Sequence, residues 1–101
     1  MTDTPSEIAR TVLAIESAAL TRLAAELPAD FDAVVSRILA LQGRVIVSGM
    51  GKSGHVANKI AATLASTGTP AQAVHPGEAS HGDLGMITRN DVVILISNSG
   101  E

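Results

Sequence analysis

Residues 44–54 read RVIVSGMGKSG, a short β-branched run that passes directly into a glycine-rich turn. Glycines bound the run Val45–Ile46–Val47 on both sides, which is typical of a strand buried on two faces in a parallel sheet. The turn lets the backbone approach a ligand, and the helix expected after it would present free N–H groups and a partial positive charge to an anion. This stretch therefore predicts an α/β protein.

Two further strands are expected downstream, a weak one at residues 71–74 and a strongly apolar one at residues 92–96. Between the first two strands we expect a helix over residues 53–67, which Gly68 ends. The expected buried face of this helix consists of Val56, Ile60 and Leu64, at four-residue spacing. The order strand, helix, strand, loop, strand predicts a doubly wound parallel sheet, a flavodoxin-like three-layer αβα fold whose ligands bind beyond the carboxyl ends of the strands.

Two leading helices are expected before the sheet, within residues 1–43. The first begins at a capping box formed by Thr4 and Glu7, with Pro5 at the first helical position, and it ends near residues 27–28. The apolar stripe along it, which needs a packing partner, comprises Ile8, Val12, Ile15, Ala19 and Leu23. The second begins after Asp30 and ends at Gly43, which we expect in a left-handed conformation. The expected buried face of the second helix comprises Phe31, Val34, Val35, Ile38 and Leu39.

Only five residues follow the last expected strand, and they are too few to form a helix that covers it. A three-stranded sheet with a bare edge is a poor end state. We therefore expect residues 1–101 to be a partial domain truncated after its third strand, with helices in 1–43 and the first three strands in 44–101. Exposed apolar surface and self-association should follow.

Composition excludes several classes of partner. The formal net charge is -3 with scattered basic residues, so we expect no nucleic acid. The chain has no cysteine, and its longest purely apolar run, residues 92–96, is far below the roughly 20 residues that span a bilayer. Acids at Asp3 and Glu7 replace the basic start of a signal peptide. We therefore expect a cytoplasmic protein that is not bound to a membrane.

The first loop, after the first strand, contains Gly49, Gly51, Lys52, Ser53 and Gly54. A phosphate-binding Walker A motif would need another glycine at the position of Ile46, so that interpretation fails. The three glycines match the dinucleotide fingerprint, but Val74–His75 stands where an acid for the ribose is expected. Dinucleotide binding, and glycines that merely permit a tight turn, remain open as alternatives to anion binding.

The second loop brings two histidines and two acids into eleven residues: His75, Glu78, His81 and Asp83. Histidine moves protons at neutral pH, and a carboxylate can orient it or act as base. A metal site from these four side chains, or a plain solvated loop, is the alternative. The third loop, Ser97, Asn98, Ser99 and Gly100, offers hydroxyls, an amide and open backbone, the groups that cradle a phosphate, although an ordinary serine turn would look the same.

Four segments in order, GMGKSG (49–54), ASTGTP (65–70), HPGEASHGDLGM (75–86) and ISNSGE (96–101), resemble the arabinose-5-phosphate isomerases of the sugar isomerase (SIS) family. The resemblance is close over residues 44–101 and loose over the leading helices. The third segment is the specific one, because the Ser-x-Ser-Gly end alone indicates only some SIS domain.

The resemblance implies interconversion of D-ribulose 5-phosphate and D-arabinose 5-phosphate, toward the Kdo sugar of lipopolysaccharide. It places the phosphate on Ser97, Ser99 and Gly100, with Ser53 as a helper, and Lys52 and His81 in the active site. It also implies a homotetramer, a pair of CBS domains further along the chain, and further acidic and histidine site residues in later elements.

The chemistry of this reaction fits the residues and needs no cofactor and no metal. Isomerisation requires a base between C1 and C2, an electrophile for the enediolate oxygen and an anchor for the phosphate. We expect His81 as acid/base, Lys52 as the cation, and Glu78 either orienting His81 or capping the loop. This piece alone is expected to be inactive. The competing hypothesis is a non-catalytic SIS module that senses a phosphosugar.

Overall fold

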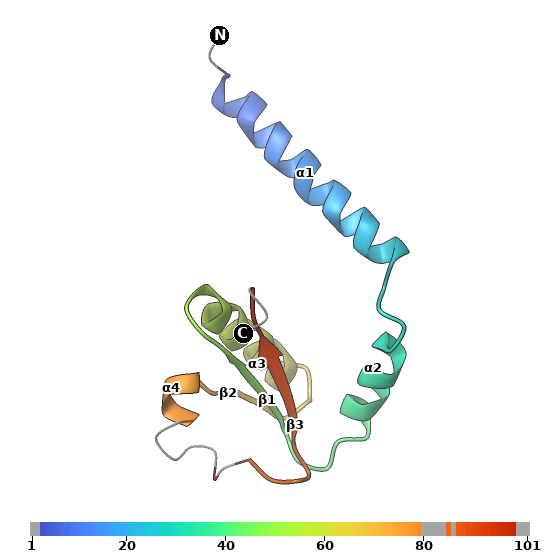
Figure 1. Cartoon of the computed structure of the whole chain (residues 1–101), viewed down its shortest axis with the longest axis vertical. Helices are drawn as coiled ribbons and strands as arrows, with labels where there is room; N and C mark the ends of the chain where they lie inside the picture. The colour runs from blue at the N-terminus through green and yellow to red at the C-terminus, as the bar shows by residue number, and fades with distance from the viewer. Residues whose placement is uncertain (1–2, 80–84, 86, 99–101) are drawn as a thin grey trace. The chain divides into compact units, whose positions relative to one another are not determined.

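The computed structural model describes residues 3–79, 85 and 87–98, without the side chains of residues 78 and 79. The elements are α1 (Pro5–Ala25), α2 (Phe31–Leu39), β1 (Val45–Gly49), α3 (Lys52–Ser66), β2 (Ala71–Ala73), α4 (Pro76–Ala79) and β3 (Val92–Ile96) (Figure 1). They fall into two compact units, Met1–Val34 and Val35–Glu101. In the described part, no helix is long and apolar enough to cross a membrane.

The first unit is dominated by α1, which begins at the predicted capping box. The Thr4 side chain accepts a hydrogen bond from the Glu7 backbone N–H at 3.2 Å, and the Glu7 carboxylate accepts one from the Thr4 N–H at 3.2 Å. Pro5 occupies the first turn, where its missing N–H costs nothing. The predicted start of α1 is therefore confirmed. None of its residues is buried, so the apolar stripe has no packing partner within the first unit.

The predicted buried face of α2 is wrong except at Ile38. Ile38 and Leu41 pack against the core of the second unit, whereas Leu39 is 79% exposed, and Phe31, Val34 and Val35 are exposed as well. The helix has nine residues, and its last turn supplies the core contact. Amphipathic spacing identified the helix but not how much of its apolar side meets the sheet.

The prediction for Gly43 is also wrong, because this glycine has no positive φ. Its N–H donates to the Asn90 carbonyl oxygen at 3.0 Å, and a Cβ at this position would lie 2.7 Å from that oxygen and would clash with the Asp91 carboxylate. Glycine is needed here for close approach to the loop before β3, and a left-handed helix end plays no part.

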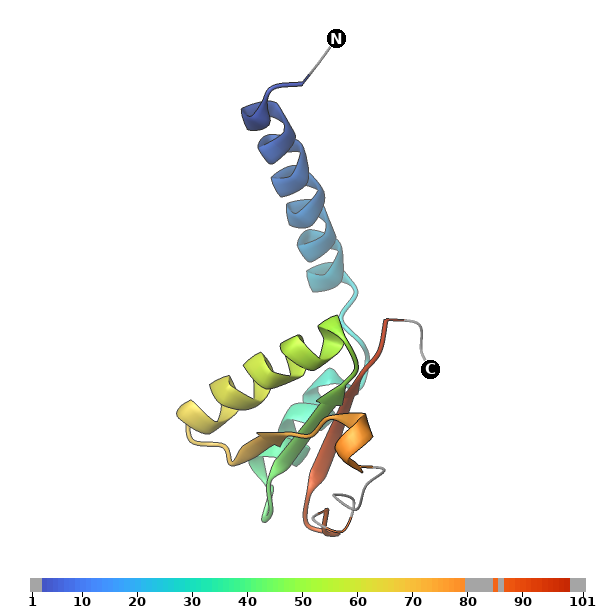
Figure 2. The same ribbon diagram turned by 90° about the vertical axis from the view of Figure 1, so that its left-hand side faces the viewer.

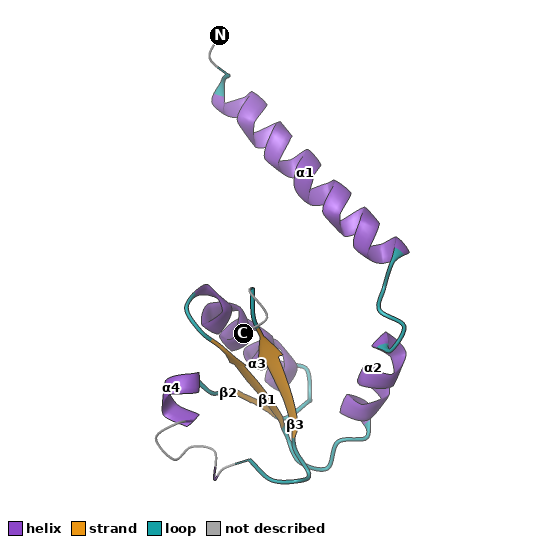
Figure 3. Ribbon diagram, viewed as in Figure 1, coloured by secondary structure: helices purple, strands orange, loops and turns teal. Residues whose placement is uncertain are grey.

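The sheet is parallel with strand order β2-β1-β3, as Figure 3 shows. β1 pairs with β2 at Val45–Val47 and with β3 from Val45 to Gly49. All five residues of β1 are buried, which confirms the predicted strand that is buried on two faces. The chain continues from β1 to β2 on one side and from β2 to β3 on the other. The strand order thus reverses at β1, which is the arrangement of a doubly wound sheet.

The core lies between β1 and α3, which runs along one face of the sheet (Figure 2). Its buried cluster consists of Val45, Val47, Ala57 and Ala61. Ile60 and Leu64 pack partly against it, but Val56 is 50% exposed, so the predicted buried face of α3 was rotated by one position there. Two alanines let the helix lie close to β1. Gly68, with φ of 103°, ends the helix as predicted.

The opposite face of the sheet shows the exposed apolar surface that was expected. Along β3, Ile94 and Ile96 face the core cluster, and the alternating Val93 and Leu95 are 43% and 76% exposed. β2 ends at Ala73, one residue earlier than predicted, and Val74 remains buried with its N–H donating to the Val47 carbonyl oxygen at 2.9 Å.

Candidate functional site

The turn between β1 and α3 is built on three glycines that each have a separate steric role. Gly51 has φ of 58°, which disfavours any residue with a Cβ. A Cβ on Gly54 would lie 2.8 Å from the Gly49 carbonyl oxygen, and a Cβ on Gly49 would lie 2.8 Å from the Ser53 backbone. The first turn of α3 can therefore pack directly on the end of β1, and Ser53 is held at that contact.

The amino end of α3 has no side-chain cap, because its N-cap residue is Gly51. Two N–H groups of the turn are used locally: those of Ser53 and Gly54 donate to the carbonyl oxygens of Met50 and Gly51 at 3.0 Å. The 15-residue helix directs the positive end of its dipole toward this turn. Such an end favours a negatively charged group nearby.

A pocket of about 510 Å³ lies where the carboxyl ends of β1 and β3 meet. Its polar walls are Ser48, Ser53, Ser97 and Asn98, with the backbone of Gly49. Its apolar walls are Met50, Pro76, Leu95 and Ile96. Because the strand order reverses at β1, this is the switch-point crevice where open α/β sheets bind ligands, and its volume lies in the usual range for small-molecule sites.

The second loop starts at the end of β2 with His75 and the short helix α4. The Nδ1 atom of His75 accepts a hydrogen bond from the Gly77 N–H at 2.9 Å. Pro76 lies between them and lines the 510 Å³ pocket. His75 itself lines a smaller hollow of about 130 Å³, together with Gly49, Gly54 and Asn58. The two cavities share Gly49.

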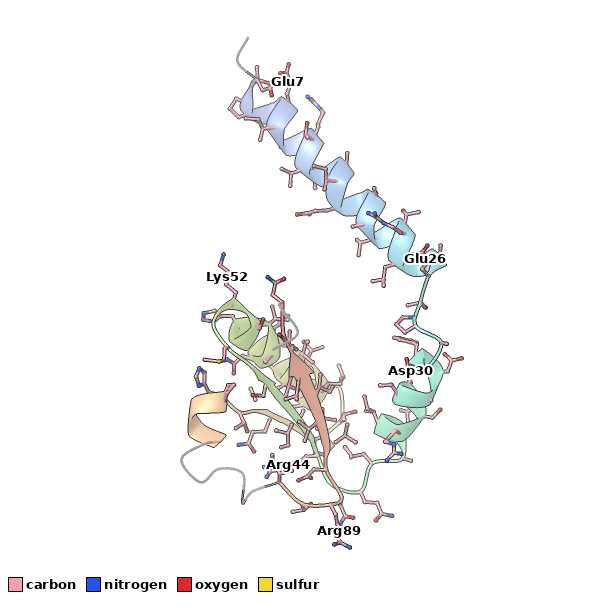
Figure 4. All side chains as sticks on the ribbon, viewed as in Figure 1. Glu7, Glu26, Asp30, Arg44, Lys52 and Arg89 are labelled. Atoms are coloured by element: carbon pink, nitrogen blue, oxygen red, sulfur yellow. The ribbon has the colours of Figure 1, made fainter. Side chains whose placement is uncertain are left out.

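The predicted site residues do not all meet in the pocket. Gly49, Ser53, Ser97 and Asn98 line it. Lys52 is exposed at the start of α3, points away from the ribbon in Figure 4 and is not part of the pocket wall. The backbone of Glu78 lies in α4, but its side chain is outside the described part, as are residues His81, Ser99 and Gly100.

Five wall residues were not predicted: Ser48, Met50, Pro76, Leu95 and Ile96. Ser48 and Met50 adjoin the glycine turn, so proximity in sequence was a usable signal. Leu95 and Ile96 were assigned only to a strand. Among the described residues, no group of three or more acidic or histidine side chains could hold a metal ion. The alternative metal site used His81 and Asp83, which lie outside those residues.

The amino ends of the strands, opposite the pocket, carry interactions that hold the fold together. A hollow of about 310 Å³ there is lined by Arg37, Arg89 and Asp91 among others, and contains none of the predicted site residues. Asp91 accepts hydrogen bonds from the Thr88 N–H at 2.7 Å and the Arg44 N–H at 2.9 Å. These two bonds lower the pKa of the Asp91 carboxyl. Figure 4 shows Arg44 and Arg89 at the end away from Lys52.

Fold and pocket together define an open-sheet α/β protein with a small-molecule crevice at the switch point of its strands. Comparison with known proteins makes this assignment specific. The chain belongs to the SIS domain family, whose sequence profile matches residues 38–101.

Similar proteins include two curated isomerases and one solved structure. Arabinose 5-phosphate isomerase KdsD of Yersinia pestis is 60% identical over 90 residues, which is 89% of this chain and 27% of that protein. KdsD of Pseudomonas aeruginosa is 58% identical over 92 residues, 91% of this chain and 28% of that protein. The structure of Escherichia coli CFT073 c3406 in complex with A5P has a TM-score of 0.85 and 42% identity, covering 98% of this chain and 54% of that one. The chain thus spans under a third of these curated relatives and about half of this solved chain.

Proposed function

We propose that this chain carries the phosphate-binding half of the active site of an isomerase that interconverts D-ribulose 5-phosphate and D-arabinose 5-phosphate. The observation that carries the proposal is the pocket between β1 and β3, which is lined by hydroxyl and amide groups and includes Ser53 from the first turn of the uncapped α3. The relatives named arabinose 5-phosphate isomerase, and the similar structure solved with A5P, support this substrate class.

The phosphate of the sugar binds in this proposal to Ser53, Ser97, Asn98, Ser99 and Gly100. The described members of this set are neutral donors, so the dianion is held by hydrogen bonds and by the dipole of α3. Gly49, Gly51 and Gly54 allow the tight turn that packs the start of α3 on the end of β1, which in this proposal presents Ser53 to the phosphate. Hydrogen bonds to a charged group are each worth roughly 1.5–3 kcal/mol, so two or three of them can fix the far end of the substrate.

The reaction moves one proton between two carbons and needs no redox cofactor. A base removes a proton from C1 of ribulose 5-phosphate, an enediolate forms, and return of the proton to C2 gives the aldose. We assign His81 as acid/base, Lys52 as the cation that stabilises the enediolate oxygen, and Glu78 as the group that orients His81. The same proposal places the protein in the cytoplasm, as a homotetramer, in the synthesis of the Kdo sugar of lipopolysaccharide.

Turnover of arabinose 5-phosphate by the longest gene product that carries this chain tests the proposal. Ser53→Ala combined with Ser97→Ala should raise KM by about tenfold or more, because two donors to the phosphate are lost. Ser36→Ala, at an exposed position on α2, is the matched control and should leave KM unchanged. His81→Ala should lower kcat by roughly 10²-fold. A wild-type protein that does not convert either pentose phosphate would refute the assignment.

A non-catalytic phosphosugar sensor is the second candidate, and one observation favours it. The described walls of the pocket contain hydroxyls, an amide and apolar groups, but no titratable side chain. Titration calorimetry together with a turnover assay separates the two functions. A sensor binds arabinose 5-phosphate but does not convert it, so neither the wild type nor His81→Ala shows turnover.

A further inference from the structure

His75 is absent from the proposed catalytic set, yet its ring is held by a defined hydrogen bond. Nδ1 accepts from the Gly77 N–H at 2.9 Å. An imidazole nitrogen that accepts a hydrogen bond carries no proton, so the neutral ring must hold its proton on Nε2. The structure therefore fixes one tautomer of His75.

The packing around this bond is close on the Gly77 side. A Cβ on Gly77 would lie 3.1 Å from Nδ1 and 3.4 Å from Cε1 of the His75 ring. A side chain at this position would press on the imidazole and lengthen the bond. Both residues of the pair are thus matched to each other in size.

The residue enclosed by this bond forms a wall of the candidate site. Pro76 stands between His75 and Gly77, begins α4 and lines the 510 Å³ pocket. Its ring fixes φ, so the remaining freedom of this backbone lies mainly in the residues on either side. The His75 ring restrains that freedom from the end of β2, and it also lines the neighbouring hollow that shares Gly49 with the pocket.

We infer that His75 is a positioning residue: its Nε2–H tautomer caps α4 through the Gly77 N–H and so holds Pro76 as a wall of the sugar-phosphate pocket. The chain reaches Glu78 one residue after Gly77 and His81 three residues later. The cap therefore lies directly before the proposed acid/base segment. The inference rests on the proposed function for its kinetic consequence, but not for the bond itself.

Two isosteres separate the roles of the two ring nitrogens. The Oδ1 atom of Asn is bonded to Cγ, as Nδ1 of His is, so His75→Asn can still accept from the Gly77 N–H. The polar atoms of Gln lie one bond further out, near the position of Nε2, so His75→Gln keeps a polar group there but loses the cap. His75→Ala loses both.

The measurement is kcat/KM for arabinose 5-phosphate in the longest gene product that carries this chain. We expect His75→Asn within about twofold of wild type, and His75→Gln and His75→Ala lower by about tenfold, since a misplaced site element costs rate steeply. His55→Gln, on the exposed surface of α3, is the control and should match wild type. If His75→Asn loses as much as His75→Ala, Nε2 is the important atom and the inference is wrong.

Amide hydrogen exchange at Gly77 gives a readout that does not depend on activity. Protection should be kept in His75→Asn and lost in His75→Gln and His75→Ala. Equal protection in all variants would overturn the inference. Absence of turnover in the wild type, with this pattern of protection present, would refute the proposed isomerase and leave the cap established.

Discussion

Asp91 shows how one half-buried carboxylate can order two backbone segments at once. Its two oxygens accept hydrogen bonds from the N–H groups of Thr88, in the loop before β3, and of Arg44, the residue before β1. Asp91→Asn keeps one acceptor and places an amide donor against the other N–H, so it should lower the midpoint of thermal unfolding at pH 7. Glu16→Gln, at an exposed position on α1, should not change it.

The pH dependence of this effect follows from the sign of the pKa shift. The pKa of Asp91 is lowered from its ordinary value of 3.8, mainly by the hydrogen bond from Thr88 and then by that from Arg44. The carboxylate therefore contributes stability that is fully present above that value and is lost as pH falls through the lower folded-state value. The gap between wild type and Asp91→Asn should narrow in acid, and a gap that widens would contradict this account.

Gly54 carries the second prediction at the residue scale. Its absent Cβ leaves room for the Gly49 carbonyl oxygen, which would otherwise lie 2.8 Å away. Gly54→Ala must push the first turn of α3 off β1, and we expect destabilisation of roughly 1–3 kcal/mol in urea unfolding together with weaker phosphosugar binding. Gly85→Ala is the control, because a Cβ there meets no atom of the described residues within 4 Å. Equal free energies of unfolding for the two variants would show that the turn can rearrange around a Cβ at residue 54 without loss of stability.

At the scale of elements, α3 is set close to β1 by two small residues, Ala57 and Ala61, which are buried. Ala57→Leu adds volume to a closed contact and should lower the free energy of unfolding by roughly 1–3 kcal/mol. Val56→Ala, one position away on the exposed side, should change it by less than about 0.5 kcal/mol. If urea unfolding shows that Val56→Ala destabilises the protein more than Ala57→Leu does, the helix is rotated from the observed orientation.

The same helix shows what sequence could and could not predict about the fold. Periodicity and the glycine stop located α3 to within a residue at each end, because local propensity and capping decide where helices lie. The sequence pattern did not reveal that alanines rather than Val56 face the sheet, since the buried face of the helix depends on how closely α3 approaches β1. The unexpected role of Gly43 has the same origin: the loop that it contacts is 47 residues away, at Asn90.

For the candidate site, loop chemistry predicted Gly49, Ser53, Ser97 and Asn98, which the pocket brings together. These residues follow parallel strands, and topology alone sends the carboxyl ends of such strands to one edge. Pro76 and Leu95 carry no chemical signal, so only coordinates could assign them to the wall. The role of Nδ1 in His75 was equally inaccessible, because a tautomer is defined by a neighbour in space.

On the scale of the whole molecule, the carboxyl ends of the strands form the candidate site and the amino ends carry stabilising hydrogen bonds. The carboxyl edge gathers the ends of β1 and β3 and the start of α4 around one pocket. The amino edge is tied by Asp91 and by a hydrogen bond from the Arg44 guanidinium to the Gln72 side-chain oxygen. The pocket lies at the carboxyl ends of the strands, so its geometry depends on the pairing register of β1 with its neighbours. That register is fixed at the amino ends of the strands, some five residues away along β1.

The exposed apolar side of α1 leads to a prediction about assembly. Ile8, Val12, Ile15 and Leu23 are exposed along one stripe of a helix that buries none of its residues, and a long apolar stripe is stable in water only when another surface covers it. We expect the 101-residue chain to self-associate, with a mass in sedimentation equilibrium that rises with concentration.

Ile15→Lys should shift the chain toward the monomer, because it places a charge in the stripe. Thr21→Lys adds the same charge about 240° around the helix from Ile15, away from the exposed Leu13 and Leu20, and should leave the association unchanged. If both lysine variants dissociate equally, net charge controls the assembly and the stripe does not; if neither does, the exposed face of β3 at Val93 and Leu95 is the surface that joins the copies.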